Sequence, residues 1–277
     1  MYTIGTFFAQ IAAGVEEMGL SHIGEALDIA RAHGICGVDI SAAEIDDGTA
    51  SLLSGAGMKT ASVYHSNPIE FKTDSLYFAS TERMKLAADK AISVGSPYFM
   101  YCPHPPKGTT AEDRAALVDA VRSQFAELCA YLKDKPITAT VEDFSIDDRG
   151  YASYDDIAFH LEHNPTLMFT YDSGNFTLAG FDEVEGANRF ANRTVHAHIK
   201  DITTTDESYP CPIIRGGKYY KGVRLGDGFV RNLEAMKLIA DGGFKDGCFI
   251  IELSNKVGRF KKTLDSVKWM QDAINML

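Results

Sequence analysis

Strand-like and helix-like patterns alternate along the whole chain, and this alternation limits the possible folds more than any other feature of the sequence. Eight short apolar stretches have the length and composition of β-strands, at 2–7, 35–40, 58–64, 97–102, 137–142, 167–172, 194–198 and 248–252. Segments with helical spacing follow them, at 21–33, 42–53, 74–94, 110–133, 154–163, 182–192, 229–240 and 262–277. No Ser/Gly-rich linker or break in composition interrupts the series.

This pattern predicts an α/β protein with a single (β/α)8 TIM barrel over residues 1–277. The length fits, since such barrels typically contain about 250 residues. A doubly wound open sheet is the alternative, but no Gly-x-Gly-x-x-Gly follows the first strand. In a barrel the C-terminal ends of all strands meet at one mouth, so residues at those ends are expected to lie close together.

Four of the predicted strands end in a side chain that can bind a metal, namely Glu142, Asp172, His198 and Glu252. Side chains alternate between the two faces of a strand, and these four lie opposite an apolar row suited to pack under helices. That row consists of Ala139, Val141, Phe169, Tyr171, Val195, Ala197, Phe249 and Ile251. Three carboxylates and one imidazole suit one divalent ion, Mn²⁺, Mg²⁺, Co²⁺ or Zn²⁺. His196 is expected to be a packed, hydrogen-bonded barrel histidine.

The segment 203–228, after the seventh predicted strand, shows little periodicity. It far exceeds the ~4–6-residue median of connecting loops, and we predict that it forms a lid over the metal. Residues 211–224 within it contain four cations and no acid. Arg215 and Arg224 are the better bidentate partners for phosphate or carboxylate, and they are predicted to bind substrate. A solvated basic loop remains the alternative.

Charge and composition exclude some classes of protein. The formal net charge of -11 argues against a nucleic-acid-binding face. The five cysteines are scattered without a C-x-x-C pair, which favours reduced thiols. The sequence shows neither a secretory signal nor a stretch of ~18 apolar residues, so we expect a cytoplasmic protein that is not embedded in a membrane.

The sequence Glu142, Asp172-Ser-Gly-Asn175, His196-Ala-His-Ile-Lys-Asp201 and Glu252 resembles the xylose isomerase-like TIM-barrel superfamily. That superfamily includes sugar isomerases, ketose epimerases, inosose dehydratases and endonuclease IV. The resemblance covers essentially the whole chain and implies that Glu142, Asp172, His198 and Glu252 bind one divalent metal. It also implies that Glu142 and Glu252 flank the substrate carbon as catalytic residues, and it favours a homodimer or homotetramer.

The activity that the resemblance implies is that of an isomerase or epimerase acting on a sugar or sugar phosphate through an enediolate intermediate. A divalent metal would stabilise the enediolate, and two carboxylates could remove and return a proton. The side chains predicted to bind substrate, besides the two arginines, are His65, His104, Asn175 and Lys200. An inosose dehydratase-like lyase is the alternative, followed by a non-catalytic metal- or sugar-binding barrel. Endonuclease IV fits poorly, because that family has a histidine at the position of Asn175.

Overall fold

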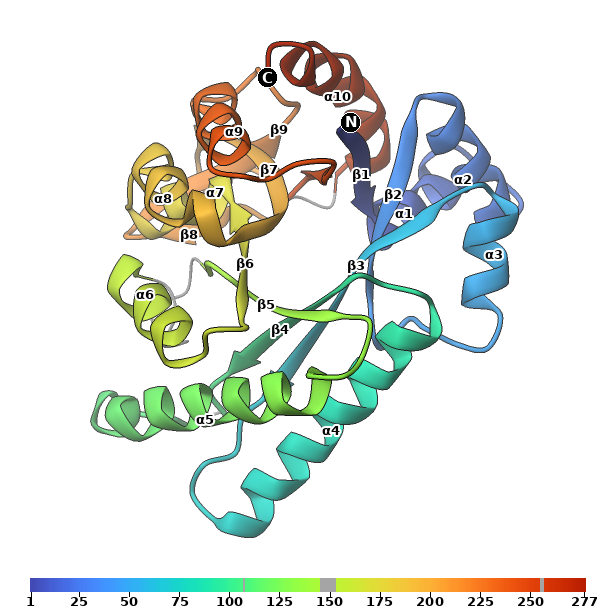
Figure 1. Ribbon diagram of the computed structural model, residues 1–277. Coiled ribbons are helices and arrows are strands. Elements are labelled where there is room, and N and C mark those ends of the chain that lie inside the picture. Colours follow the sequence, from blue (N-terminus) through green and yellow to red (C-terminus); the bar gives the residue numbers. More distant parts are fainter. Residues whose placement is uncertain (107, 145–152, 255–256) are drawn as a thin grey trace.

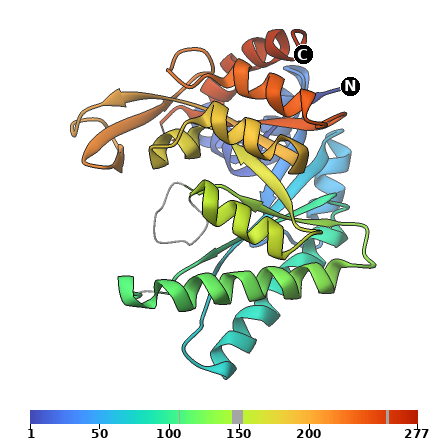
Figure 2. The ribbon, with the colours of Figure 1, turned by 60° about the vertical axis from the view of Figure 1, so that its left-hand side comes forward.

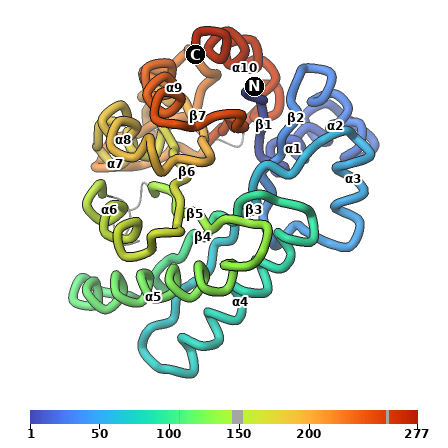
Figure 3. The backbone as a smooth tube through the Cα atoms, in the orientation of Figure 1, coloured from blue at the N-terminus to red at the C-terminus, as the bar shows by residue number. Residues whose placement is uncertain are grey.

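The computed structural model describes residues 1–106, 108–144, 153–254 and 257–277. Its centre is a closed barrel of eight parallel strands, visible in Figures 1 and 3, and the predicted (β/α)8 fold is confirmed. Strand β10 pairs with both β7 and β1 and so closes the ring. The barrel strands are β1 Thr3–Phe7, β2 Ile35–Ser41, β3 Lys59–Pro68, β4 Tyr98–His104, β5 Thr138–Glu142, β6 Met168–Asp172, β7 Thr194–Thr205 and β10 Cys248–Glu252.

Helices surround the barrel on its outside (Figure 1). They are α1 Phe8–Glu17, α2 Ile23–Ala32, α3 Thr49–Gly55, α4 Asp74–Ser93, α5 Arg114–Leu132, α6 Tyr154–His163, α7 Ser173–Ala179, α8 Glu183–Phe190, α9 Asn232–Asp241 and α10 Arg259–Ile274, with short 3-10 turns at Ala111–Asp113 and Ala191–Arg193. Among the described residues, no helix has both the length and the apolar character needed to cross a membrane.

Two helices, α1 and α7, are absent from the sequence-based prediction. Helix α1 follows β1 without an intervening loop and contains Gly14, a poor helix former. The structure explains this glycine, because a Cβ at position 14 would lie 2.3 Å from the ring of Phe260 on α10. Close packing of α10 on α1 therefore requires the residue that weakens the helical pattern.

The two faces of the barrel strands differ in polarity as predicted. The helix-facing row contributes buried apolar side chains to the main core, among them Val141, Phe169, Tyr171, Phe249 and Ile251. The interior row near the mouth is mostly polar and buried, with Glu252 partly exposed. Apolar packing between strands and helices therefore stabilises the barrel from outside, while its interior is left for charged groups.

The segment 203–228 differs from the irregular loop that the sequence predicts. Strand β7 continues to Thr205, and β8 Ile213–Arg215 and β9 Lys218–Val223 pair with each other and with β7 in antiparallel fashion. Gly216 and Gly217 have φ values of 51° and 73°, as a two-residue hairpin turn requires. The Gly-Gly pair between two β-prone stretches is the signal that the sequence-based interpretation missed. Figure 2 shows this extension projecting from the barrel.

A buried glutamine fastens the seam where the barrel closes. Gln10 on α1 donates from Nε2 to the carbonyl oxygen of Ile251 at 3.1 Å and to Oγ1 of Thr263 on α10 at 2.9 Å. Its Oε1 accepts the backbone N–H of Leu253 at 2.6 Å. One side chain thus links α1, α10 and the C-terminal end of β10, next to Glu252.

We expect Gln10→Leu to lower the free energy of unfolding by about 1–3 kcal/mol, because it leaves the buried N–H of Leu253 without its acceptor. Urea denaturation of the purified variant measures this loss. Gln271→Leu, which removes an exposed glutamine on α10, is the matched control and should change stability far less. Equal losses in the two variants would show that the bonds of Gln10 do not hold the seam.

Candidate metal centre

The four predicted ligands come together at the mouth of the barrel. Glu142, Asp172 and Glu252 are the last residues of β5, β6 and β10, and His198 lies inside β7. Strand register aligns His198 with Asp172 on one side and with Ile250 on the other. One ligand atom from each of the four side chains lies within 4.8 Å of the others.

The two ring nitrogens of His198 contact different groups. Nδ1 lies 2.5 Å from Oε1 of Glu142, 3.4 Å from Oε2 of Glu252 and 3.9 Å from Oδ2 of Asp172. Nε2 points the other way and lies 2.9 Å from Oδ2 of Asp39 on β2. Burial alone would lower the pKa of His198, but Glu142 and Asp39 outweigh it and raise the pKa. Nδ1 is therefore the nitrogen that faces the other three ligands.

Asp172 ends its strand and begins the next helix. Its Oδ1 accepts the backbone N–H groups of Gly174 and Asn175, at 2.8 and 3.0 Å, and so caps α7. This cap fixes the carboxylate and leaves Oδ2 directed at the cluster, 2.8 Å from Nζ of Lys200. Gly174 is required here, since a Cβ would meet the Lys200 side chain at 2.6 Å.

Lys200 is buried and joins the cluster from β7. Its Nζ lies 2.8 Å from Asp172, 2.7 Å from Glu252 and 3.0 Å from Oδ1 of Asn175. Burial alone would lower the pKa of this ammonium group, but the carboxylates of Asp172 and Glu252 outweigh it and raise the pKa. Lys200 therefore stays protonated at neutral pH and can donate hydrogen bonds at the mouth.

Two carboxyl groups of the cluster resist ionisation. Burial raises the pKa of Glu252 to about 7, with Asp172 adding to the rise and Lys200 opposing it. Burial, Asp172 and Glu142 also raise the pKa of Asp143, whose Oδ1 accepts the backbone N–H of Asp172 at 2.8 Å. A carboxyl group with a pKa near neutrality can both release and accept a proton, as general acid–base catalysis requires.

The charges and spacing of the cluster fit a divalent cation. The carboxyl groups of Asp39, Glu142, Asp172 and Glu252 face the basic side chains of Lys200 and His198, so acidic groups outnumber basic ones by two. Ligands 2.0–2.2 Å from one ion lie at most about 4.4 Å apart, so the observed 4.8 Å requires only a small closure. The mostly oxygen donor set suits hard or borderline ions.

A cavity of about 220 Å³, which we call the mouth cavity, opens above this cluster. It is lined by Phe7, Tyr64, Ser66, Met100, Cys102, Glu142, Phe144, Asn175, Lys200 and Glu252. Asp172 and His198 lie beneath it and are fully buried. Two of the predicted ligands, Glu142 and Glu252, thus line the cavity with Lys200 and Asn175, while the other two do not reach its surface.

Other residues predicted to bind substrate lie elsewhere. The His65 ring stacks against Phe99 and Tyr101 on the helix-facing side of the strands, because β3 continues to Pro68 and Tyr64 and Ser66 take the interior face. His104 shares a strand face with Met100 and Cys102 but lies beyond the mouth cavity, with Nδ1 3.2 Å from the carbonyl oxygen of Pro105. Neither histidine lines the mouth cavity, and the roles of His65 and His104 in substrate binding stay predictions.

The two predicted arginines do not line the mouth cavity either. Arg224 forms an exposed ion pair with Asp227, 2.8 Å away. Arg215 lies on β8 and lines a different cavity with Lys218 and the C-terminal end of α7. The basic stretch is partly neutralised by an acid three residues beyond it, and it belongs to the antiparallel extension rather than to the mouth.

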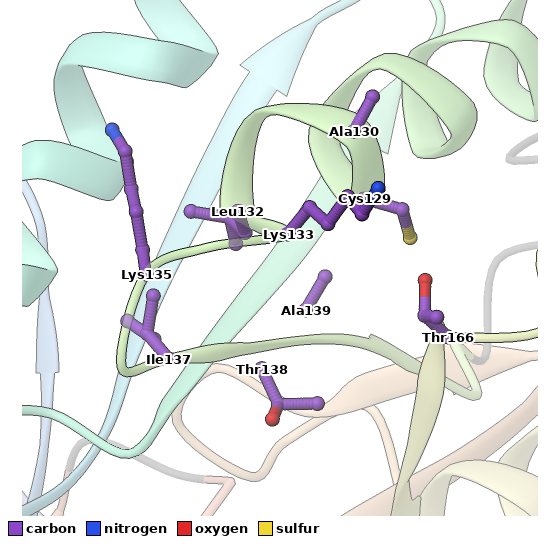
Figure 4. Close-up of a pocket in the computed structure, with 9 residues that line it drawn as sticks. All are labelled: Cys129, Ala130, Leu132, Lys133, Lys135, Ile137, Thr138, Ala139 and Thr166. Atoms are coloured by element: carbon purple, nitrogen blue, oxygen red, sulfur yellow. The ribbon is translucent and has the colours of Figure 1, made fainter.

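A larger cavity, of about 400 Å³, lies at the opposite end of β5 from Glu142 (Figure 4). It is lined by the C-terminal end of α5 and by the first residues of β5, with Cys129, Lys133, Lys135, Thr138 and Thr166 as its polar members. Among the residues that the structure describes, no imidazole or carboxylate lines it. In TIM barrels chemistry takes place at the C-terminal ends of the strands, so size alone does not make this cavity the functional site.

Sequence reasoning missed Asp39 and Asp143. Asp143 directly follows a predicted ligand, which was a usable signal. Asp39 lies within an otherwise apolar strand, Ile35–Ser41, on the interior face and fully buried. A lone carboxylate in such a strand is unusual and was the only signal available. His196 is the hydrogen-bonded barrel histidine that the sequence predicts, buried with Nε2 2.8 Å from Asp39.

Solved structures of other proteins share this fold. A sugar phosphate isomerase/epimerase from Parabacteroides distasonis is 16% identical, with 97% of this chain and 93% of that chain covered and a TM-score of 0.71. A xylose isomerase-like TIM barrel protein from Mycobacterium smegmatis, solved in complex with magnesium, is 15% identical. The match covers 100% of this chain and 99% of that chain, with a TM-score of 0.71. A probable 3-DHS dehydratase from Bacillus anthracis is 14% identical, with 97% of this chain and 98% of that chain covered and a TM-score of 0.72. At these identities the likeness concerns the fold alone.

No curated protein sequence matches this chain. The family model of the xylose isomerase-like TIM barrel, in contrast, matches residues 27–273. This match runs from the second helix almost to the C-terminus and includes all four residues of the metal cluster. The closed barrel is also the architecture that the family description states. The chain therefore belongs to the xylose isomerase-like TIM barrel family.

Proposed function

We propose that this protein is a metal-dependent isomerase or epimerase that acts on a small sugar through an enediolate intermediate. The observation that carries the proposal is the cluster of Glu142, Asp172, His198 and Glu252 beneath the mouth cavity. Sugar isomerisation needs a base beside a carbon next to a carbonyl group, and a means of stabilising the negative charge that develops. Both requirements match groups in this cluster.

The four residues would hold one divalent ion, Mn²⁺, Mg²⁺, Co²⁺ or Zn²⁺. When bound, such an ion supplies Lewis acidity, which stabilises negative charge on substrate oxygens. The M. smegmatis relative is described in complex with magnesium, which supports a divalent ion in this family. The Nδ1 atom of His198, facing three carboxylates, is the natural nitrogen ligand.

The two glutamates would move the protons. Glu142 and Glu252 both line the mouth cavity and come from β5 and β10, on different sides of His198. A substrate in the cavity would therefore have a carboxyl group on each of two sides. Epimerisation uses both, since a proton leaves one face of the carbon and returns to the other, whereas isomerisation can use one. Glu252, whose burial raises its pKa to about 7, suits an exchange of protons near neutral pH.

The mouth cavity favours a neutral sugar over a sugar phosphate. Its volume of about 220 Å³ suits a small ligand, and the aromatic rings of Phe7, Tyr64 and Phe144 offer apolar surface to a sugar ring. Among the described residues that line it, Lys200 is the one cation, and its charge is balanced by Asp172 and Glu252. Lys200 and Asn175 would then donate hydrogen bonds to substrate hydroxyl or carbonyl oxygens.

A lyase of the inosose dehydratase kind is the second candidate. The B. anthracis relative is described as a probable dehydratase, and dehydration begins with the same proton abstraction beside a carbonyl group. The products differ in mass, because an isomerase conserves the mass of its substrate and a dehydratase removes one water. A barrel that binds metal or sugar without catalysis is the third candidate.

We expect the Mn²⁺-loaded protein to exchange a substrate α-proton with D₂O for at least one member of a panel of neutral and phosphorylated sugars. Mass spectrometry of the same samples separates isomers from products lighter by one water. Glu142→Gln is the matched variant, since its amide can still offer an oxygen to the metal but cannot act as a base. It should slow exchange by about 10²–10⁴-fold while metal content changes less. Metal-loaded parent protein that exchanges no proton across the panel would support the non-catalytic alternative.

His198→Ala should lose the metal and leave the barrel folded, because the side chain belongs to the mouth rather than to the apolar layer between strands and helices. Metal analysis after dialysis against Mn²⁺-containing buffer, together with circular dichroism, measures both effects. His163→Ala, on the exposed surface of α6, is the control and should keep the parent's metal content. If His198→Ala retains one metal per chain, the four-residue ligand set is wrong.

The stability of the metal-free protein should depend on pH through Glu252. Its pKa rises from 4.5 to about 7 on folding, so its contribution to stability is full below pH 4.5 and is lost as the pH rises through about 7. The change is at most about 1.4 kcal/mol per pH unit. The test compares the free energy of urea unfolding of the parent and of Glu252→Gln between pH 4 and pH 8 (roughly the window of the shift). Parallel curves for the two proteins would contradict the raised pKa.

A further inference from the structure

We propose that Asp39 is a positioning residue of the metal centre, and that it fixes the ring orientation and the tautomer of His198. The inference rests on the proposed metal-dependent function. It concerns a residue on β2, a strand that carries none of the four ligands. Asp39 does not line the mouth cavity and is fully buried.

The geometry joins Asp39 to both histidines of β7. Its Oδ2 lies 2.9 Å from Nε2 of His198 and 2.8 Å from Nε2 of His196. In the order of the ring, β10 and β1 separate β2 from β7, so these contacts cross the interior of the barrel. An ionised carboxylate oxygen can only accept hydrogen bonds, so each imidazole donates its Nε2–H to Asp39.

This donation decides which nitrogen of His198 remains available for a metal. A neutral imidazole carries one proton, and holding it on Nε2 leaves the lone pair on Nδ1. Nδ1 is the atom that lies 2.5 Å from Glu142 and 3.4 Å from Glu252. Carboxylates that accept the distal N–H of a metal-binding histidine commonly fix its tautomer and orientation in this way.

A second hydrogen bond, from His196, holds the Asp39 carboxylate in place. The two histidine rings are nearly perpendicular, at 85°, with centroids 5.2 Å apart, and they converge on the same carboxylate oxygen. The Phe7 ring meets His198 edge-on at 5.0 Å and restricts its rotation from another side. The other oxygen of Asp39, Oδ1, is buried without a hydrogen-bond partner among the described residues. An apolar residue would avoid this cost, so the carboxylate is better explained by its two imidazole contacts.

Asp39, His196 and His198 are also close enough to form a metal site of their own. In that arrangement Nε2 of His198 would bind a metal instead of donating a proton. The distances of 2.8 and 2.9 Å are those of hydrogen bonds, and the positioning role requires one metal per chain. Metal stoichiometry and the protonation of Nε2 therefore separate the two arrangements.

The test measures binding of Zn²⁺ to the full-length protein by calorimetry with a competing chelator, together with ¹⁵N NMR of histidine-labelled protein. We expect one Zn²⁺ per parent chain, bound at Nδ1 of His198, with the proton on Nε2. Asp39→Asn should raise the Kd for Zn²⁺ by about 10–100-fold. Its side-chain NH₂ can donate to Nε2, so the neutral imidazole of metal-free His198 should carry its proton on Nδ1 in the variant and on Nε2 in the parent. Spectra of both proteins are recorded at a pH high enough for this imidazole to be neutral, and a merely structural role would not produce the difference.

Glu183→Gln is the matched control, since Glu183 is another buried carboxylate but pairs with Arg231 outside the cluster. It should bind Zn²⁺ like the parent. Unchanged affinity and an unchanged tautomer in Asp39→Asn would overturn the inference and leave the proposed function standing. Two Zn²⁺ per parent chain, with one lost in Asp39→Asn, would replace it by a second metal site. A parent that binds no Zn²⁺, Mn²⁺ or Mg²⁺ would overturn the metal centre itself.

Should Asp39→Asn fail to fold, the NMR spectrum of the Zn²⁺-loaded parent decides. A protonated Nε2 on His198, with metal on Nδ1, supports the positioning role. Metal on Nε2, or a proton on Nδ1, overturns it.

Discussion

The pairing of β10 with both β7 and β1 is the constraint on which the rest of the structure depends. It closes the sheet into a ring, and closure brings the ends of strands that are far apart in sequence to one mouth. Glu142 and Glu252 are separated by more than a hundred residues, yet both contact Nδ1 of His198. Gln10 reinforces the same seam by accepting the backbone N–H that follows Glu252.

Closure also has an electrostatic consequence. Carboxylates gathered in a buried interior raise one another's pKa values, and burial adds to the effect, as Glu252 and Asp143 show. Such a cluster is costly unless cations balance it, and Lys200 and His198 supply part of that balance. The remaining negative charge suits a divalent ion, and the same raised pKa values suit proton transfer. Metal binding and proton transfer would therefore both result from the clustering of acidic side chains at the strand ends.

The antiparallel extension shows how composition can mislead about position. Its cations suggested an anionic ligand at the mouth, but Arg224 pairs with Asp227 and Arg215 lies on β8, beyond the mouth cavity. The carboxylate of Asp201 holds the connection back to the barrel by accepting the backbone N–H groups of Gly226, Gly228 and Val230. The segment is thus anchored at its base, and its basic residues do not line the mouth cavity.

The sequence by itself determined the barrel and the cluster of three acids and one histidine, because strand alternation and strand ends are local properties that a period of two reveals. The limits of a strand were less certain. The sequence-based prediction ends β3 at Tyr64, yet the strand continues to Pro68 and turns the His65 side chain toward the helices. Only the tertiary structure revealed Asp39. Alternation tells which face a residue occupies, but closure of the ring alone decides which distant side chain lies opposite it across the interior.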